Sequence, residues 1–216
     1  MPHPSRSAEQ AACTPPEVKI EDFNQSCVIP YGLTPLAICQ AMNDFVQFLK
    51  VINEQLHARQ FPRFEHIIMQ ANFSSLVGEF VGSSIPKHCS TIVRNRYHNG
   101  HPDLIPEGSF ENDSAQHSSE GIEIKASRYL HGWQGHNPEE VWLLVFCFES
   151  NARGDEANQA PAIPFRFLNV YGAKLTQNDW NYSGRSETSR RTITASVNRS
   201  GYEKMTRNWI YQAPTS

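Results

Sequence analysis

An uninterrupted apolar run, VWLLVFCF at residues 141–148, limits the folds open to this chain. A strand with one buried face alternates apolar and polar residues, whereas a strand buried on both faces is apolar throughout. The run is also much shorter than the roughly 18 residues that a membrane span needs. We therefore predict a central β-strand here, in a sheet that is covered on both faces.

Four other segments have the length and the β-branched and aromatic content of strands, and clusters of Gly, Pro, Asn and Asp separate them. They are STIVRNRYH at 90–98, GIEIKAS at 121–127, PFRFLNVYGAKL at 164–175 and RRTITASVN at 190–198. The second of these alternates, so it should present one polar face. Together with the central strand, these segments predict one mixed sheet.

Helical spacing of apolar residues precedes the strands. In residues 34–60, Thr34 is the predicted N-cap and Pro35 the first helical residue, and apolar residues then recur at intervals of three and four. The apolar face of this helix suits the core or a dimer interface equally well. A second helix is predicted from Phe64 to about Gly82.

A last helix is predicted to start at Ser200, which stands in capping-box spacing to Glu203. The order of elements predicts an α/β (α+β) fold with a central mixed β-sheet flanked by helices. Residues 1–17 are rich in Pro, Ser and Ala without periodicity, so we expect a flexible N-terminal arm that is disordered or loosely docked. Residues 18–216 then form a single domain.

Composition restricts the environment of the protein. The chain of 216 residues, 39% of them hydrophobic, can bury one good core. Its N-terminus lacks the basic and then apolar layout of a signal peptide. Five cysteines, an odd number without a C-x-x-C pair, fit reduced thiols better than disulfides or a zinc site. We therefore expect a cytoplasmic protein with no membrane partner.

Charge is distributed unevenly along the chain. The formal net charge is −3, but the segment from Tyr182 to Tyr211 contains six basic and two acidic residues. Proteins contact nucleic-acid phosphates mainly through Lys and Arg. This segment therefore permits a polyanion-binding surface, although an ordinary solvated face would have the same composition.

A second pattern concerns the alternating strand at 121–127. Glu123 and Lys125 should point to its polar face, while Ile122 and Ile124 point into the core. The polar connection after Asp103 could return the chain antiparallel and set Asp103 beside Glu123. Two carboxylates at such close range raise each other's pKa, and a divalent cation such as Mg²⁺ removes that cost by coordination.

Pro102-Asp103 and Glu123-Ile124-Lys125 resemble the motifs of the PD-(D/E)xK nuclease superfamily, in its type II restriction endonuclease-like form. The resemblance covers about residues 74–148 as a catalytic core and implies a restriction-endonuclease-like fold. It implies that Asp103 and Glu123 bind Mg²⁺, with Mn²⁺ as a substitute, and that the backbone carbonyl of Ile124 can be a further ligand. It also implies that Lys125 positions or deprotonates the attacking water.

The helix that precedes these motifs carries Glu79, and many members of the superfamily have a glutamate on such a helix that reaches the site. The resemblance therefore makes Glu79 a catalytic candidate. A glutamate between glycines can equally be exposed or serve as a cap.

Four histidines, His98, His101, His131 and His136, flank the predicted hairpin. Their spacing does not match the helix-borne H-E-x-x-H zinc site, and no cysteine pair accompanies them. Contact with a phosphate or the sugar backbone is therefore a better expectation for them than a metal role.

The segment at about 180–210 is the predicted DNA-recognition region. It is dense in Arg, Ser, Thr and Asn, whose side chains hydrogen-bond to phosphate oxygens and base edges. The candidate DNA contacts are Arg185, Arg190, Arg191, Asn198 and Arg199. An exposed strand with polar side chains remains the alternative.

These features predict a Mg²⁺-dependent, sequence-specific endonuclease of the type II restriction kind. It would act on double-stranded DNA and leave 5′-phosphate and 3′-hydroxyl ends. A palindromic target would imply a homodimer in which each subunit cuts one strand. Two alternatives remain: a repair or recombination nuclease that recognises DNA structure, and a noncatalytic DNA-binding module on a nuclease-like core.

Overall fold

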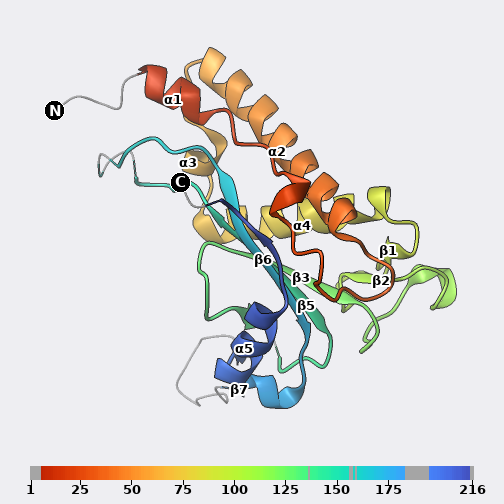
Figure 1. The fold of residues 1–216 in the computed structure, drawn as a ribbon. Coiled ribbons are helices and arrows are strands. Elements are labelled where there is room, and N and C mark those ends of the chain that lie inside the picture. Colours follow the sequence, from red (N-terminus) through yellow and green to blue (C-terminus); the bar gives the residue numbers. More distant parts are fainter. Residues whose placement is uncertain (1–5, 136, 156–157, 159, 183–194, 215–216) are drawn as a thin grey trace.

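The computed structural model describes residues 6–135, 137–155, 158, 160–182 and 195–214 (Figure 1). The helices are α1 (Arg6–Ala12), α2 (Pro35–Ala58), α3 (Phe64–Ile67), α4 (Gln70–His88) and α5 (Arg199–Arg207), with 3-10 turns η1 (Ile20–Asp22), η2 (Glu111–Asp113) and η3 (Gln177–Asp179). The strands are β1 (Ile92–Arg94), β2 (Leu104–Pro106), β3 (Ile122–Ser127), β4 (Gln134–Gly135), β5 (Trp142–Glu149), β6 (Arg166–Lys174), β7 (Trp180–Tyr182), β8 (Ala195–Val197) and β9 (Trp209–Gln212). Among the helices of these ranges, none has the length and apolar character of a transmembrane span.

Six strands form a mixed sheet in the order β1-β2-β3-β5-β6-β9. Neighbouring strands are antiparallel except β3 and β5, which run parallel. Three short strands form a second, antiparallel sheet in the order β4-β8-β7. The expectation of a single sheet is therefore wrong, because residues 195–197 pair with β4 and β7 instead of joining the larger sheet.

Strand β5 is central and covered on both faces, as the apolar run predicts. Its even-numbered residues Leu144, Phe146 and Phe148 belong to a core shared with α2 and α4. Its odd-numbered residues Leu143, Val145 and Cys147 belong to a second core, in which the other members include Trp133, Trp180 and Met205. Figure 1 shows α2 and α5 on opposite sides of the β5 and β6 strands. The α+β architecture with a central mixed sheet flanked by helices is thus observed.

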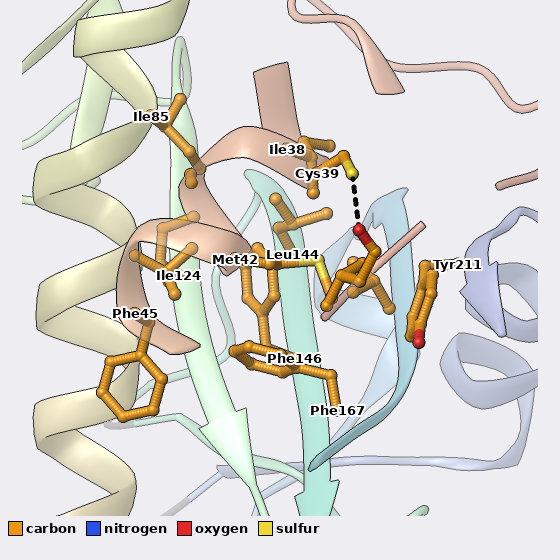
Figure 2. Packing of buried hydrophobic residues seen from close by; sticks show 14 of the residues in the cluster. Ile38, Cys39, Met42, Phe45, Ile85, Ile124, Leu144, Phe146, Phe167 and Tyr211 are labelled. Carbon is orange, nitrogen blue, oxygen red and sulfur yellow. Dashed lines mark hydrogen bonds between the residues drawn. The ribbon is translucent and has the colours of Figure 1, made fainter. Parts of the chain in front are cut away.

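Helix α2 follows its predicted start. The side chain of Thr34 accepts a hydrogen bond from the backbone N–H of Ala37 at 3.2 Å, and Pro35 occupies the first turn. The apolar face of α2, which includes Met42 and Phe45, is fully buried against the sheet (Figure 2). This face therefore belongs to the core of the chain.

The predicted second helix is divided into α3 and α4. Ile68 and Met69 have extended backbone between the two helices. The preceding Glu65 is buried, and it accepts a hydrogen bond from Asn53 at 2.9 Å and pairs with Arg63. These contacts with α2 hold α3 in place independently of α4, and the apolar spacing of the segment does not reveal them.

Helix α4 continues past its predicted end at Gly82 and includes Pro86. Its last turns pack on α2, since Ile85 is fully buried and the Ser84 hydroxyl hydrogen-bonds to Asp44. Tertiary packing therefore outweighs the local helix-breaking tendency of Pro86.

The described part of the expected N-terminal arm is docked on the rest of the chain. Residues 6–12 form α1, and Cys13 is buried. Glu9 forms an ion pair with Arg63 at 2.9 Å, and the backbone N–H of Val18 donates to Asn43 at 2.8 Å. The segment is thus docked by polar contacts distant in sequence, which composition alone does not show. Residues 1–5 lie outside the described residues.

The last helix, α5, starts at Arg199 and is capped by Asn198 instead of Ser200. The Asn198 side chain accepts a hydrogen bond from the N–H of Gly201 at 3.1 Å. The Ser200 hydroxyl donates to Asp179 at 3.1 Å. The prediction of Ser200 as the cap is wrong by two residues, because Ser200 has this other partner.

Candidate functional site

Strands β2 and β3 place the two predicted acidic residues together. Leu104 pairs with Ile122 in antiparallel register, so the polar connection returns the chain as expected. The approach requires Gly121, whose φ is +138° and whose position has no room for a Cβ atom, since that atom would lie 2.3 Å from the carbonyl oxygen of Leu104. The backbone at this point brings Asp103 beside β3.

The side chains of β3 alternate as predicted. Ile122 and Ile124 lie in the core, while Lys125 and Glu123 form an ion pair on the other side. Asp103 accepts a hydrogen bond at 2.8 Å from the backbone N–H of Ile124. The expected ligand group of Ile124 is its carbonyl, so this contact shows only that Asp103 is held against the backbone of β3.

Glu123 is buried, with 5% of its surface exposed, although it was expected on a polar face. Its cover comes partly from His101, whose Nδ1 lies 2.9 Å from Glu123 Oε2. The opposite ring nitrogen, Nε2, lies 3.7 Å from Glu139 Oε2. His101 thus lies between the carboxylates of Glu123 and Glu139. The sequence suggested only phosphate or sugar contacts for this residue.

Glu139 is a site residue that the sequence did not indicate. It lies in the segment between β4 and β5, and its backbone carbonyl accepts a hydrogen bond from Trp180 Nε1 at 3.0 Å. Its side chain is 9% exposed. No motif surrounds Glu139, whereas His101 could have been selected because it directly precedes Pro102-Asp103.

The two acidic residues of the predicted motif, Asp103 and Glu123, have pKa values that are shifted in opposite directions. Burial and the nearby Glu123 carboxylate raise the pKa of Asp103 to about 7. Burial would also raise the pKa of Glu123, but the hydrogen bond from His101 and the charge of Lys125 outweigh it and lower that pKa to about 2. The expectation that each carboxylate raises the pKa of the other is therefore met for Asp103 and wrong for Glu123.

The pKa values of His101 and Lys125, the two basic partners of Glu123, are also shifted. Burial would lower the pKa of His101, but Glu123 and then Glu139 raise it above its ordinary value. Burial likewise opposes the charge of Lys125, and Glu123 and Asp103 raise its pKa. The buried negative charge is thus compensated by two neighbouring side chains that gain protons more readily than usual.

These side chains lie in a polar cavity of about 730 Å³. Glu79 lines it, and the Glu79 side chain is 58% exposed and paired with Arg94. Glu79 therefore lines the same cavity as Asp103, where its carboxylate contacts the Arg94 guanidinium. The other lining residues are Asn95, Tyr97, His98, Asn99, Gly100, His101, His117, Glu123, Lys125, Asn137 and Glu139.

The histidines have different positions. His98 is exposed and lines the cavity, and His131 is exposed. The ring of His117 lies 5.4 Å from that of His101, between centroids. His136 lies outside the described residues.

The predicted DNA contacts are only partly placed. Arg185, Arg190 and Arg191 lie outside the described residues. Asn198 caps α5 and donates to the carbonyl of Asn178 at 2.8 Å, so both ends of its amide already have partners. Arg199 is 92% exposed in its side chain and pairs with Glu203 at 2.9 Å.

No protein-family profile, curated protein or solved structure matches this chain significantly. The function therefore has to be inferred from the geometry and charges of the site.

Proposed function

We propose that the protein is a Mg²⁺-dependent, sequence-specific double-stranded DNA endonuclease of the type II restriction kind. The observation that carries the proposal is the convergence of Asp103, Glu123 and Lys125 in one polar cavity. These residue types, on two antiparallel strands, are those that a metal-dependent phosphodiesterase needs. We further propose that the sheet and α4 form a restriction-endonuclease-like core.

The donor set fits a hard cation. Asp103 and Glu123 offer carboxylate oxygens at close range, and Mg²⁺ prefers oxygen ligands. The raised pKa of Asp103, caused by burial and by Glu123, means that its charged form lacks sufficient compensation from the protein alone. Asp103 and Glu123 would hold the ion, with the carbonyl of Ile124 as a further ligand.

Each residue of the chain has a distinct part in the proposed reaction. Bound Mg²⁺ would offset the negative charge of the phosphoryl group and lower the pKa of a water molecule. Lys125, held by Glu123 and with a raised pKa, would orient that water as a charged hydrogen-bond donor, and solvent would accept the proton. In-line attack would leave a 5′-phosphate and a 3′-hydroxyl. Glu79, at the wall of the cavity, would be a catalytic residue by its position.

The same cavity suits a nucleic-acid substrate. Arg94 and Asn99 line it together with the catalytic set, and both side chains can donate hydrogen bonds to phosphate oxygens. Arg199 and the arginines at 185, 190 and 191 remain proposed DNA contacts. We propose a cytoplasmic homodimer, because a palindromic site is cut most simply by two symmetric subunits.

Cleavage of plasmid and phage DNA tests this function directly. We expect Mg²⁺ or Mn²⁺ to support cutting, and Ca²⁺ to support binding without cutting, because Ca²⁺ accepts looser geometry. Lys125→Ala should reduce the cleavage rate at least about 100-fold, as loss of a preorganised hydrogen-bond donor does, and leave binding nearly intact. Lys50→Ala, on the outer face of α2 with a Glu54 partner at 4.0 Å, is the matched control. Gel electrophoresis and gel shift measure the two properties.

The products also separate the alternatives. Discrete fragments from intact DNA would support the restriction function, whereas cleavage confined to branches or ends would favour the repair nuclease. Binding without cleavage in every metal would favour the noncatalytic module. Cleavage that persists in excess EDTA, or at the normal rate in Lys125→Ala, would contradict the proposed chemistry.

A further inference from the structure

We propose that His101, Glu123 and Glu139 form a second metal site, selective for a divalent transition-metal ion such as Co²⁺ or Zn²⁺. The proposed Mg²⁺ site shares Glu123 with this site, but its proposed ligands include neither His101 nor Glu139 and offer oxygen atoms only. Each of the three residues offers one ligand atom, and these atoms all lie within 4.8 Å of one another.

The contacts around the imidazole support this site. The separation of 3.7 Å between His101 Nε2 and Glu139 Oε2 exceeds the range of a good hydrogen bond. Two ligands that each lie about 2.1 Å from one ion are about 3 to 4 Å apart, depending on the angle between them. One ion can bind only one ring nitrogen, so Nε2 would be the ligand next to Glu139, while the 2.9 Å contact of Nδ1 with Glu123 Oε2 orients the ring. The ligand atoms of the three residues lie within 4.8 Å of one another, so Glu123 would complete the site by turning toward the ion held by Nε2 and Glu139.

The two oxygens of Glu123 face different neighbours. Oε1 contacts Lys125, on the side of Asp103, whereas Oε2 contacts His101. One carboxylate can thus contribute an oxygen to each of two sites. The Glu139 side chain approaches the edge of the His101 ring that is opposite the Glu123 contact.

The three side chains are largely buried, unlike those of a cluster of exposed surface residues. The exposed fractions of the side chains are 16% for His101, 7% for Glu123 and 9% for Glu139. All three nevertheless line the cavity of about 730 Å³, so an ion has a route to them from solvent. The Trp180 indole fixes the backbone of Glu139 at 3.0 Å. A divalent ion would replace the proton on His101 as the positive partner of these two largely buried carboxylates.

The ligand types determine which ions should bind. Mg²⁺, Ca²⁺ and Mn²⁺ suit oxygen ligands, whereas an imidazole nitrogen favours Co²⁺ and Zn²⁺ in comparison. The pair Asp103 and Glu123 contains no nitrogen ligand, so the two sites should differ in selectivity. This inference concerns metal binding and requires no nuclease activity, although it uses one residue of the proposed catalytic set.

Titration with Co²⁺ in a large excess of Mg²⁺ tests the site. The full chain, stripped of metal, should bind one Co²⁺ per subunit, measured by calorimetry and by the visible absorption of Co²⁺ with a nitrogen ligand. Glu139→Gln should weaken this binding at least about 10-fold, the usual result of removing a ligand or its close support. Glu140→Gln, at the exposed neighbouring glutamate, is the matched control and should bind like the wild type.

Further variants make the outcome decisive. Asp103→Asn should retain the Co²⁺ site under Mg²⁺ excess, and His101→Asn should lose both the absorption and the binding. If His101→Asn does not fold, Glu139→Gln decides, because it preserves the size of the side chain. Unchanged Co²⁺ affinity in Glu139→Gln, or no Co²⁺ binding in excess Mg²⁺, would overturn the second site. Intact Co²⁺ binding in a protein that cuts no DNA would refute the nuclease proposal only.

Discussion

Glu123 is the residue at which the charges of the site meet. It contacts Lys125 through one oxygen and His101 through the other, and these contacts keep it ionised. Asp103 lies beside an ionised, buried neighbour and therefore gains a proton more readily. The charged form of Glu123 thus stabilises the folded protein, whereas ionisation of the neighbouring Asp103 side chain destabilises it.

This asymmetry predicts that Asp103→Asn stabilises the metal-free protein. The folded-state pKa of Asp103, about 7, lies above the ordinary value of 3.8 because of burial and Glu123. Its contribution to stability is therefore fully present below about pH 4 and is lost as the pH rises through 7. We expect the melting temperature of the variant to exceed that of the wild type by about 3 °C or more at pH 8, equivalent to roughly 1 kcal/mol, and by less at pH 5.

Glu123→Gln is the control for this prediction, with the opposite sign. Because the folded-state pKa of Glu123 is lowered to about 2, its charge stabilises the fold above about pH 4.5, and this contribution is lost as the pH falls through 2. The variant should melt below the wild type at pH 8. Thermal unfolding in EDTA, followed by circular dichroism, measures both. A pH-independent difference between Asp103→Asn and wild type would contradict the electrostatic explanation.

The sequence predicted that three candidate site residues lie together, because strand periodicity and one hairpin are local features. Glu123 and Lys125 share a face because they are two apart, and Asp103 joins them through one hairpin. His101 and Glu139 meet because separate loops converge, and periodicity carries no information on such convergence. The burial of Glu123 was missed for the same reason, since its cover comes from those loops.

At the scale of elements, α4 and β3 form the support of the site. Gly78 and Gly82 face β3, where a Cβ atom on either would already be in van der Waals contact with Ala126 or Ile124. Small residues on this side of α4 therefore let the helix approach the strand closely. Glu79 follows directly in sequence and is thereby carried to the wall of the cavity.

Two of the proposed DNA contacts, Asn198 and Arg199, lie at the start of α5. Substitution of Asn198 should reduce stability, whereas substitution of Arg199 should reduce DNA affinity. Asn198→Ala removes the N-cap of α5 and should lower the free energy of unfolding by about 1 kcal/mol. Arg199→Ala changes a side chain that is 92% exposed, so stability should change by at most about 0.5 kcal/mol. DNA affinity should fall in Arg199→Ala if this residue contacts phosphates.

Urea unfolding and gel shifts at two salt concentrations check this pair. Asn198→Asp is the conservative control, because aspartate also accepts a hydrogen bond from the N–H of Gly201 and should restore the cap. Equal stability of Asn198→Ala and wild type would show that the cap contributes nothing. Unchanged DNA affinity and salt dependence in Arg199→Ala would remove Arg199 from the DNA surface.

Elements with strong local signals were predictable, and those that depend on distant partners were not. The cap at Thr34 and the apolar run of β5 are local, and both occur where expected. The break after α3 depends on Glu65, which is held by Arg63 and Asn53 from outside its own helix. The separate sheet of β4, β8 and β7 depends on packing around Trp133 and Trp180, which strand propensity does not encode.

At the scale of the whole molecule, one buried side chain connects parts of the chain that are far apart. Arg63 is 1% exposed, and it pairs with Glu9 of α1 and donates to Asn151 at 2.6 Å and to the carbonyl of Ile163 at 3.0 Å. It thereby joins the N-terminal segment to the connection between β5 and β6. The N-terminal segment is thus one of the partners that compensate a buried positive charge.

This connection predicts that deletion of residues 1–16 destabilises the fold. The deletion removes Glu9 from Arg63, and it removes the buried Ala12 and Cys13, which exposes the α2 surface beneath them. We expect a loss of about 3 kcal/mol in the free energy of unfolding, from one weakened buried ion pair and the exposed apolar area. The midpoint of urea unfolding, measured in metal-free buffer, should fall accordingly.

Two further variants show whether the docked segment is the cause. Deletion of residues 1–5 removes none of these contacts and should leave the midpoint unchanged. Glu9→Gln should lower it by a fraction of the full effect, because Glu9 is 26% exposed in its side chain and glutamine can still accept a hydrogen bond from Arg63. Trypsin should also cleave the longer deletion faster, since weakened packing on α2 opens that region more often. An unchanged urea midpoint and cleavage rate after deletion of residues 1–16 would mean that the segment is the flexible arm its composition predicts, with Arg63 adequately compensated by Glu65 alone.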